Sequence, residues 1–157
     1  MSDDVMTYFP ALRAYSLALC RNGPDAEDLV QETLLRAIEK AHQYQRGTNM
    51  RAWLFSIMRS RFLNNCAKGA RERTGAKDCA SLIPRSKPSQ EWHLMAGEMA
   101  RALNDMPAHY REAIVLVGAL GVSYIEAAEL LACDIGTIKS RVNRARSLLR
   151  QQLQPDD

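Results

Sequence analysis

The segment GVSYIEAAELLACDIGTIKSRVNRARSLLR, residues 121–150, decides the fold of the C-terminal part of this chain. Ser123 and Glu126 have the spacing of a capping box, in which the serine hydroxyl accepts from a backbone amide of the first turn and the glutamate reaches back. A short helix, a tight turn over 132–134 and a longer basic helix from near Ile135 follow. This order predicts a helix-turn-helix.

The longer helix has one apolar face and one polar face at helical spacing. Its apolar side chains are Ile138, Val142, Ala145 and Leu149. Its candidate DNA-binding side chains are Thr137, Lys139, Ser140, Arg141, Asn143 and Arg144. Arginine and asparagine suit bidentate contacts with base edges, and lysine, arginine and serine suit phosphates. A basic helix packed in an all-α bundle is the alternative interpretation of this pattern.

The distribution of charge supports two contacts with a polyanion. The formal net charge of the 157-residue chain is only +3. Residues 1–45 carry −3 and 78–135 carry −4, whereas 46–77 carry +7 and 136–150 carry +5. Two concentrated basic stretches are typical of a nucleic-acid-binding protein. Solvated helix faces explain the charge pattern by itself equally well.

The N-terminal part is expected to form three helices around a small core. The first runs from about Asp4 to Arg21 and ends at the turn signal of residues 22–24. The second has acids in its first turn, where the helix dipole favours them. Its expected apolar stripe is Leu29, Val30, Thr33, Leu34, Ala37, Ile38 and Ala41. The third begins near Met50 and turns Trp53, Leu54, Ile57, Met58 and Phe62 inward.

Basic side chains follow the third helix. Arginines and lysines interleaved with Trp53, Phe55 and Phe62 suit backbone tracking and base stacking on a single strand. Because Trp53 and Phe62 lie on the apolar stripe, a core position explains them better than stacking does. The cations are therefore the stronger candidates for a nucleic-acid contact.

No strand-like alternation or internal repeat is present, so the sequence predicts an all-α fold of two small helical domains. We expect domains over 1–73 and 91–157. Residues 74–90, rich in glycine, serine, lysine and proline, have no helical period and are expected to be a flexible linker of roughly 20–25 Å. The C-terminal part is expected to contain four helices.

Several classes of function are disfavoured. No apolar run is long enough to span a membrane, and the acidic start MSDDVMTYFP does not have the pattern of a signal peptide. The four cysteines have neither zinc-ligand nor disulfide-framework spacing, and we expect no metal and no cofactor. The three histidines show no triad spacing and no phosphate-binding glycine loop is present, so we expect no enzyme activity.

Three segments together resemble regions 2 and 4 of extracytoplasmic-function (ECF) sigma factors. They are DAEDLVQETLLRAIEKA (25–41), MRAWLFSIMRSRFLNN (50–65) and GVSYIEAAELLACDIGTIKSRVNRARSLLR (121–150). LVGALGVSYIEAAEL is also similar to the group that controls the alphaproteobacterial general stress response. Two positions depart from the family pattern: Ser60 stands where many members have asparagine, and Ala132-Cys133-Asp134 forms a turn in which glycine is frequent.

The resemblance implies a bacterial, cytoplasmic transcription-initiation subunit that binds core RNA polymerase, reads promoter DNA and is held inactive by an anti-sigma factor. Region 4 would read the -35 element, and the third helix with the residues after it would melt and read the -10 element. The -10 candidates are Arg59, Ser60, Arg61, Asn64, Lys68, Arg71 and Arg73. The polymerase-binding candidates are Asp28, Gln31, Glu32 and Arg36. A sigma-like mimic, which sequesters an anti-sigma factor without reading promoters, is the alternative.

Overall fold

The computed structural model describes residues 2–73 and 90–153, and every regular element in these ranges is helical. The N-terminal half contains α1 (Ser2–Thr7), α2 (Phe9–Cys20), α3 (Gly23–Glu39), a 3₁₀ turn (Ala41–Gln43) and α4 (Met50–Arg73). The C-terminal half contains α6 (Gln90–Asn104), α7 (Ala108–Ile114), a π-helical turn (Val115–Ala119), α8 (Tyr124–Leu131) and α9 (Ile135–Leu153). The all-α prediction is confirmed. The linker predicted over 74–90 lies outside the described residues, apart from Gln90.

The first predicted helix is wrong in one respect, because the structure divides it into α1 and α2. Tyr8 separates the two helices with a non-helical ψ of 5°, and Pro10 stands in the first turn of α2. Proline has no backbone N–H, so it is accommodated in a first turn but interrupts a continuous helix. The second predicted helix begins as expected: Asn22 caps α3 by accepting a hydrogen bond of 2.9 Å from the amide of Asp25.

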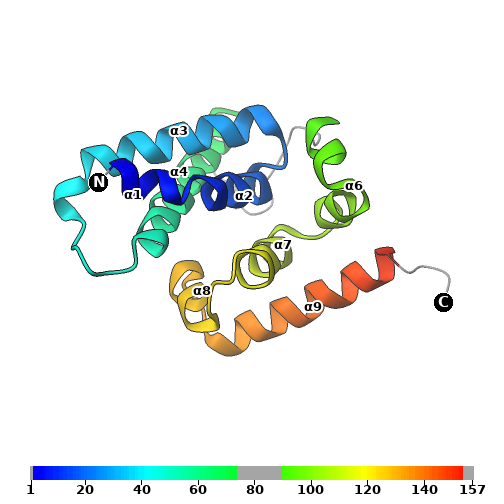
Figure 1. Cartoon of the computed structure of the whole chain (residues 1–157). Coiled ribbons are helices and arrows are strands. Elements are labelled where there is room, and N and C mark those ends of the chain that lie inside the picture. The colour runs from blue at the N-terminus through cyan, green and yellow to red at the C-terminus, as the bar shows by residue number, and fades with distance from the viewer. Residues whose placement is uncertain (1, 74–89, 154–157) are drawn as a thin grey trace.

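The two halves lie against each other rather than apart. In Figure 1, α1–α4 form the upper group of helices and α7–α9 lie below them. Helix α2 contacts α7 and α4 contacts α8, and the buried core is continuous between the halves. Leu12, Leu54 and Met58 are fully buried above, and Leu116, Ile138 and Val142 are fully buried below. Sequence periodicity assigned Leu54, Met58, Ile138 and Val142 to buried faces but did not predict the contact between the halves.

The helix-turn-helix forms as predicted. The Ser123 hydroxyl accepts a hydrogen bond of 3.1 Å from the amide of Glu126 at the start of α8. The turn residue in the left-handed region is Ala132, with φ 54° and ψ 49°. A side chain with a Cβ is strained in this conformation, which is the one that glycine adopts freely.

Replacement Ala132→Gly is expected to increase the free energy of unfolding by about 0.5–1 kcal/mol. It removes the strain of the left-handed turn, although part of the gain is offset by the greater freedom of glycine in the unfolded chain. Ala119→Gly is the matched control, because Ala119 is also exposed and has no positive φ. We expect this control to lose stability in urea unfolding monitored by circular dichroism. A loss in both variants would contradict the strain at Ala132.

Candidate nucleic-acid and protein interfaces

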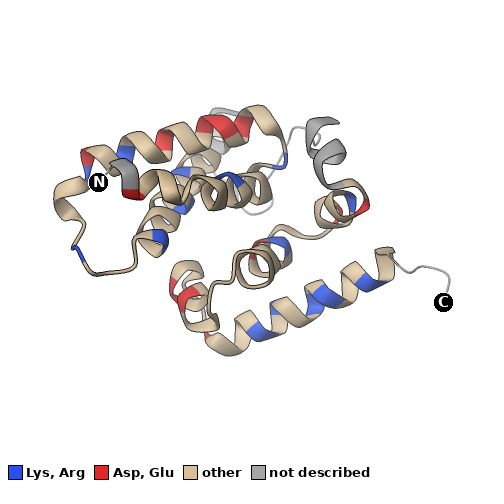
Figure 2. Ribbon diagram, in the orientation of Figure 1, with Lys and Arg blue, Asp and Glu red and all other residues tan. Residues whose placement is uncertain are grey.

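One face of α9 is anchored and the opposite face is free for contact. Ile138, Val142 and Ala145 are fully buried against the rest of the C-terminal half. The polar face predicted from the sequence points outward: Lys139, Ser140, Asn143 and Arg144 are exposed, and Thr137 and Arg141 are half-buried. Figure 2 shows the resulting series of basic residues along α9. The helix therefore presents hydroxyl, amide and guanidinium groups together, the set that reads base edges and binds phosphates.

A hollow of about 560 Å³ beside α9 adds two residues that the sequence did not single out. His109 and Tyr110, from the first turn of α7, line it with their rings 4.2 Å apart. The other lining residues are Gly136, Thr137, Ser140, Arg141 and Arg144 of α9. Burial, followed by repulsion from Arg141, lowers the pKa of His109 below 6.5. Nothing in the local sequence pairs His109 with α9, because the two meet only through the packing of α7 on α9.

The -10 candidates on α4 fall into four groups. Ser60, Asn64 and Lys68 are exposed and follow one another at intervals of four residues, so they lie on one side of the helix. Arg61 instead turns toward α3, where its Nε lies 3.2 Å from Glu32 Oε2. Arg59 turns toward the C-terminal half, where its Nε lies 2.9 Å from Glu112 Oε2. The side chains of Arg71 and Arg73 lie outside the description, although the backbone of α4 continues to Arg73.

The aromatic residues of α4 belong to the packing and not to a stacking surface. Phe55 is 1% exposed and its ring centre lies 5.0 Å from that of Tyr15. Phe62 is buried, and the half-buried Trp53 packs against Tyr44 at 5.0 Å between ring centres. The cations and amides of α4 are consequently the available groups for a nucleic acid, as the apolar pattern indicated.

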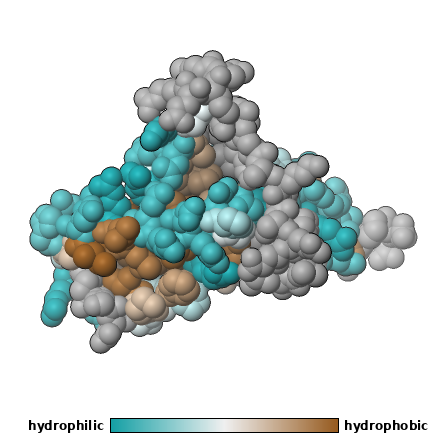
Figure 3. All heavy atoms as spheres, turned by 90° about the horizontal axis from the view of Figure 1, so that it is seen from above, coloured by the Kyte–Doolittle hydropathy of each residue, from teal (hydrophilic) through white to brown (hydrophobic). Residues whose placement is uncertain are grey.

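The outer face of α3 combines acidic and apolar side chains. Of the polymerase-binding candidates, Asp28 and Gln31 are exposed, whereas Glu32 and Arg36 are half-buried. The assignment of Ile38 to the buried stripe is wrong, since Ile38 is 66% exposed and Leu35 is 61% exposed. Figure 3, a view from above, shows an apolar area beside hydrophilic side chains on the coloured part of this face. Such a mixture suits a protein partner better than a polyanion.

A further hollow, of about 830 Å³, lies where the loop before α4 meets the start of the chain. Its polar lining includes His42, Tyr44, Arg46, Thr48 and Asn49. The Tyr44 hydroxyl donates to the Thr48 carbonyl at 2.9 Å, which fixes the tyrosine across the loop. The sequence showed only a helix break here, because the lining forms through the fold of the loop.

Neither a membrane span nor a metal centre is found in the described ranges. None of the helices over 2–73 and 90–153 is both long and apolar enough to cross a bilayer. The same residues contain no group of three or more histidine, cysteine or acidic side chains placed to hold a metal ion. Cys20 and Cys133 are free thiols, and burial raises the pKa of Cys20 to about 12.

Both halves of the chain match known family models. Residues 5–72 match the model of Sigma-70 region 2, and residues 96–149 match that of Sigma-70 region 4. The ECF RNA polymerase sigma factor EcfG of Rhodopseudomonas palustris is 45% identical over 99% of this chain and 86% of its own length. The chain belongs to the ECF sigma factor family.

Two solved structures resemble this ECF sigma factor over nearly its whole length. The sigma factor RpoE of Bartonella quintana, solved in complex with the anti-sigma factor NepR, has a TM-score of 0.80 and 39% identity, covering 99% of this chain and 98% of its own. CnrH, solved in complex with the cytosolic domain of CnrY, has a TM-score of 0.74 and 24% identity, covering 99% and 88%, and supports the fold alone.

Proposed function

We propose that this ECF sigma factor binds core RNA polymerase and directs promoter-specific initiation, without performing chemistry itself. The observation that carries the proposal is the anchored α9, which exposes Lys139, Ser140, Asn143 and Arg144 while its opposite face is buried. Membership of the ECF family supports the same function. Because core polymerase works in the bacterial cytoplasm, this is the proposed location.

Each half has its own proposed role. Residues 1–73 would bind polymerase through α3 and read the -10 element through α4, where Ser60, Asn64 and Lys68 are the accessible candidates. Residues 91–157 would read the -35 element through α9, and residues 74–90 would link the halves. Two modest DNA contacts on one chain gain affinity through effective concentration.

An anti-sigma factor is the proposed regulator, and a stress response the proposed setting. The support is the likeness to RpoE, whose solved structure contains the anti-sigma factor NepR. The exposed apolar side chains Leu35 and Ile38 on α3 offer a surface that such a protein could cover. Co-purification of the tagged chain from unstressed and stressed cells tests this; we expect a partner that dissociates on stress.

Reconstituted transcription with cognate core polymerase and a genomic library tests the function. We expect start sites preceded by two shared elements at a fixed spacing. An equimolar mixture of the two separated halves is the control, since it lacks the covalent linkage that provides effective concentration. Equal initiation by the intact chain and the mixture would contradict the proposed role of the linkage, and absence of specific starts would contradict the function.

The sigma-like mimic remains the second candidate function. It predicts anti-sigma binding without promoter protection. The exposed polar side chains of α9, including Arg144, favour promoter reading over this alternative. Footprinting with the holoenzyme separates the two, because only a promoter reader protects both elements.

Acidification is expected to strengthen binding of the -35 duplex through His109. A phosphate in the hollow beside Arg141 and Arg144 would favour protonated His109, whose pKa is low in the free protein owing to burial and Arg141. On its other side, His109 lines a cavity with Arg59, Arg111 and Glu112. Since binding then takes up a proton, affinity rises as pH falls below 6.5 toward the lowered pKa of His109 in the free protein.

The measurement is the dissociation constant for a -35 duplex at pH 7.5 and 5.5, for the wild type and for His109→Gln. We expect acidification to increase wild-type affinity by about 3–10-fold more than that of the variant, because one pKa unit corresponds to a factor of ten. An identical pH dependence in both proteins would remove His109 from the DNA surface.

A further inference from the structure

Glu112 of α7 is the centre of a buried polar contact between the two halves. Its Oε2 accepts hydrogen bonds from the Tyr15 hydroxyl of α2 and from Arg59 Nε of α4, the latter at 2.9 Å. The Glu112 side chain is 11% exposed and that of Arg59 is 24% exposed. Arg59, a cation proposed to serve promoter DNA, is therefore held by the other half of its own chain.

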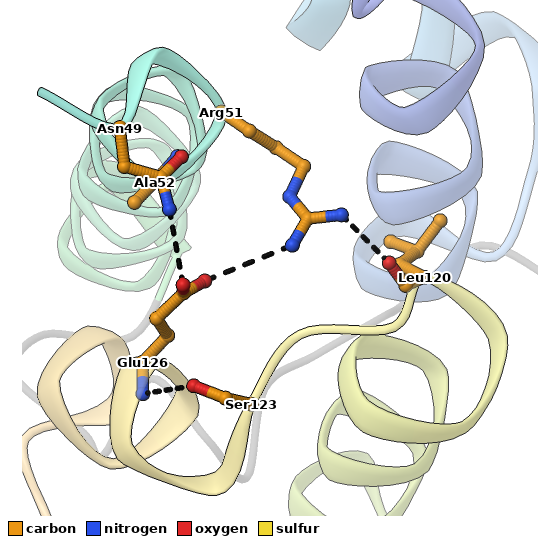
Figure 4. Close-up of polar contacts among 6 residues, drawn as sticks. All are labelled: Asn49, Arg51, Ala52, Leu120, Ser123 and Glu126. Carbon is orange, nitrogen blue, oxygen red and sulfur yellow. Dashed lines mark hydrogen bonds and ion pairs between the residues drawn. The ribbon is translucent and has the colours of Figure 1, made fainter. Parts of the chain in front are cut away.

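Glu126 of α8 makes a second contact between the halves, shown in Figure 4. Its amide donates to the cap residue Ser123, as the capping box predicted, but its carboxylate does not reach back to the cap and instead reaches the start of α4. There Oε1 accepts from Asn49 Nδ2 at 3.0 Å, and Oε2 lies 3.7 Å from Arg51 Nη2. Arg51 also donates from Nη1 to the Leu120 carbonyl at 2.8 Å. The capping-box glutamate thus joins the helix-turn-helix to the N-terminal half.

The interface between the halves contains buried charged side chains, which water would solvate better if the halves separated. Arg111 of α7 is 1% exposed and donates to the carbonyls of Ala18 in α2 and Met106, at 2.7 and 3.0 Å. Burial, together with repulsion from Arg21, lowers the pKa of Arg111 to about 10. Buried ion pairs recover only part of the hydration that their charges lose. Loss of one carboxylate should therefore favour separation.

Packing beside these charges is incomplete. A partly open pocket of about 90 Å³ lies between the halves, bordered by Arg59, Phe62 and Leu63 from one half and Ala108 and Glu112 from the other. Atoms that line it lack the dispersion contacts that a filled interior would provide. Although apolar side chains also meet across it, an interface that carries buried charge and a pocket resembles the separable interfaces between domains.

The closed arrangement is too small to contact both promoter elements at once. This step rests on the proposed function. A compact chain of 157 residues has a radius of gyration of about 15 Å, or roughly 40 Å across. Two elements centred about 25 base pairs apart are separated by roughly 85 Å at about 3.4 Å per base pair. The 16 residues from 74 to 89 can extend to about 55 Å, which is enough to let the halves move apart.

We propose that Glu112 and Glu126 form an intramolecular latch that keeps the free sigma factor closed and lowers its affinity for polymerase. Polymerase and the promoter bind the open form, in which Arg59 and Arg51 are released from the two glutamates. Because only the open fraction is competent, apparent affinity falls in proportion to that fraction. The latch is built from this chain alone and acts before any regulator binds.

Small-angle X-ray scattering of the full chain, without polymerase, tests the closed state. We expect the wild type to be compact and the double variant Glu112→Gln/Glu126→Gln to gain at least about 5 Å in radius of gyration. Glu129→Gln is the matched control, an exposed acid one turn further along α8, and is expected to stay compact. Far-UV circular dichroism must show equal helix content in all three. A wild type that is already expanded, or a double variant that stays compact, would overturn the latch.

A charge exchange tests the Glu126 contact directly and does not depend on the buried cluster. Glu126→Arg faces Arg51 with a like charge and is expected to expand the chain. Adding Arg51→Glu restores an ion pair and should restore compactness. Expansion that the second change does not reverse would mean that Arg51 and Glu126 do not hold the halves together.

Titration of core polymerase with the same proteins tests the regulatory consequence. We expect the Glu112→Gln/Glu126→Gln variant to bind about 3–10-fold more tightly than the wild type and Glu129→Gln to be unchanged. Expansion without tighter binding would overturn the inhibitory role. If no variant forms a holoenzyme, the proposed function fails, whereas the scattering result still decides whether the latch exists.

Discussion

Charge reversal at Arg144 is expected to lower affinity for the -35 duplex by about 10–100-fold, the largest effect of any single change on the exposed face of α9. Arg144 is exposed on the side of α9 opposite the fully buried Ile138, Val142 and Ala145. It also lines the hollow with Arg141, so a glutamate there would face DNA phosphates with the wrong sign. The change lies on the surface, and the fold should be retained.

Arg150→Glu is the control for Arg144→Glu. Both residues are exposed on α9 and both variants change the net charge equally, but Arg150 lies in the last turn, away from the hollow. Fluorescence anisotropy over a range of salt concentrations, with cognate and scrambled duplexes, separates two roles. A base contact reduces discrimination between the duplexes, whereas a phosphate contact weakens both and lowers the salt slope by about 1. Equal losses for Arg144→Glu and Arg150→Glu would indicate a non-specific charge effect.

Local patterns in the sequence predicted the elements well, because they depend on neighbours within a few residues. The Ser123 cap, the turn after α8 and the buried face of α9 all follow from spacing and turn chemistry. The break at Tyr8 was missed, although it also depends on local sequence, since Pro10 disfavours a continuous helix through this position. The exposure of Ile38 could not be predicted from neighbouring residues. The helical stripe gives the direction of a side chain but does not show whether another element covers it.

The candidate site was predicted less completely, since its missing members meet only in three dimensions. Tyr15 and Glu112 are 97 residues apart in sequence, and no local pattern links them. Arg59 and Arg61 looked equivalent in the sequence, yet they pair with acids in different halves of the chain. His109 joins α9 for the same reason, through helix packing. Composition indicated basic surfaces; only the fold distinguishes an accessible cation from one that is already paired.

Truncation of Ile138 is expected to cost about 2–4 kcal/mol in the free energy of unfolding, the largest loss of stability predicted here. Ile138 is fully buried at the start of α9, where it holds the DNA-facing helix against the C-terminal half. Ile138→Ala removes buried apolar area and leaves a cavity that the neighbouring helices fill only in part. Domains of roughly 60 residues have only a few kcal/mol of stability, so the C-terminal half should become substantially unfolded near 37 °C.

Ile135→Ala is the matched control, because it makes the same chemical change one turn earlier on α9 at a residue that is 40% exposed. We expect it to cost less than about 1 kcal/mol, since a side chain that is 40% exposed loses less buried apolar area than the fully buried Ile138. Urea unfolding followed by circular dichroism gives the two free energies, and binding of the -35 duplex shows their consequence. Ile138→Ala should lose duplex binding at 37 °C and regain it at 15 °C, where more of the half is folded. Similar losses for both variants would mean that α9 is not held by its buried face, and the orientation of Arg144 toward DNA would lose its physical basis.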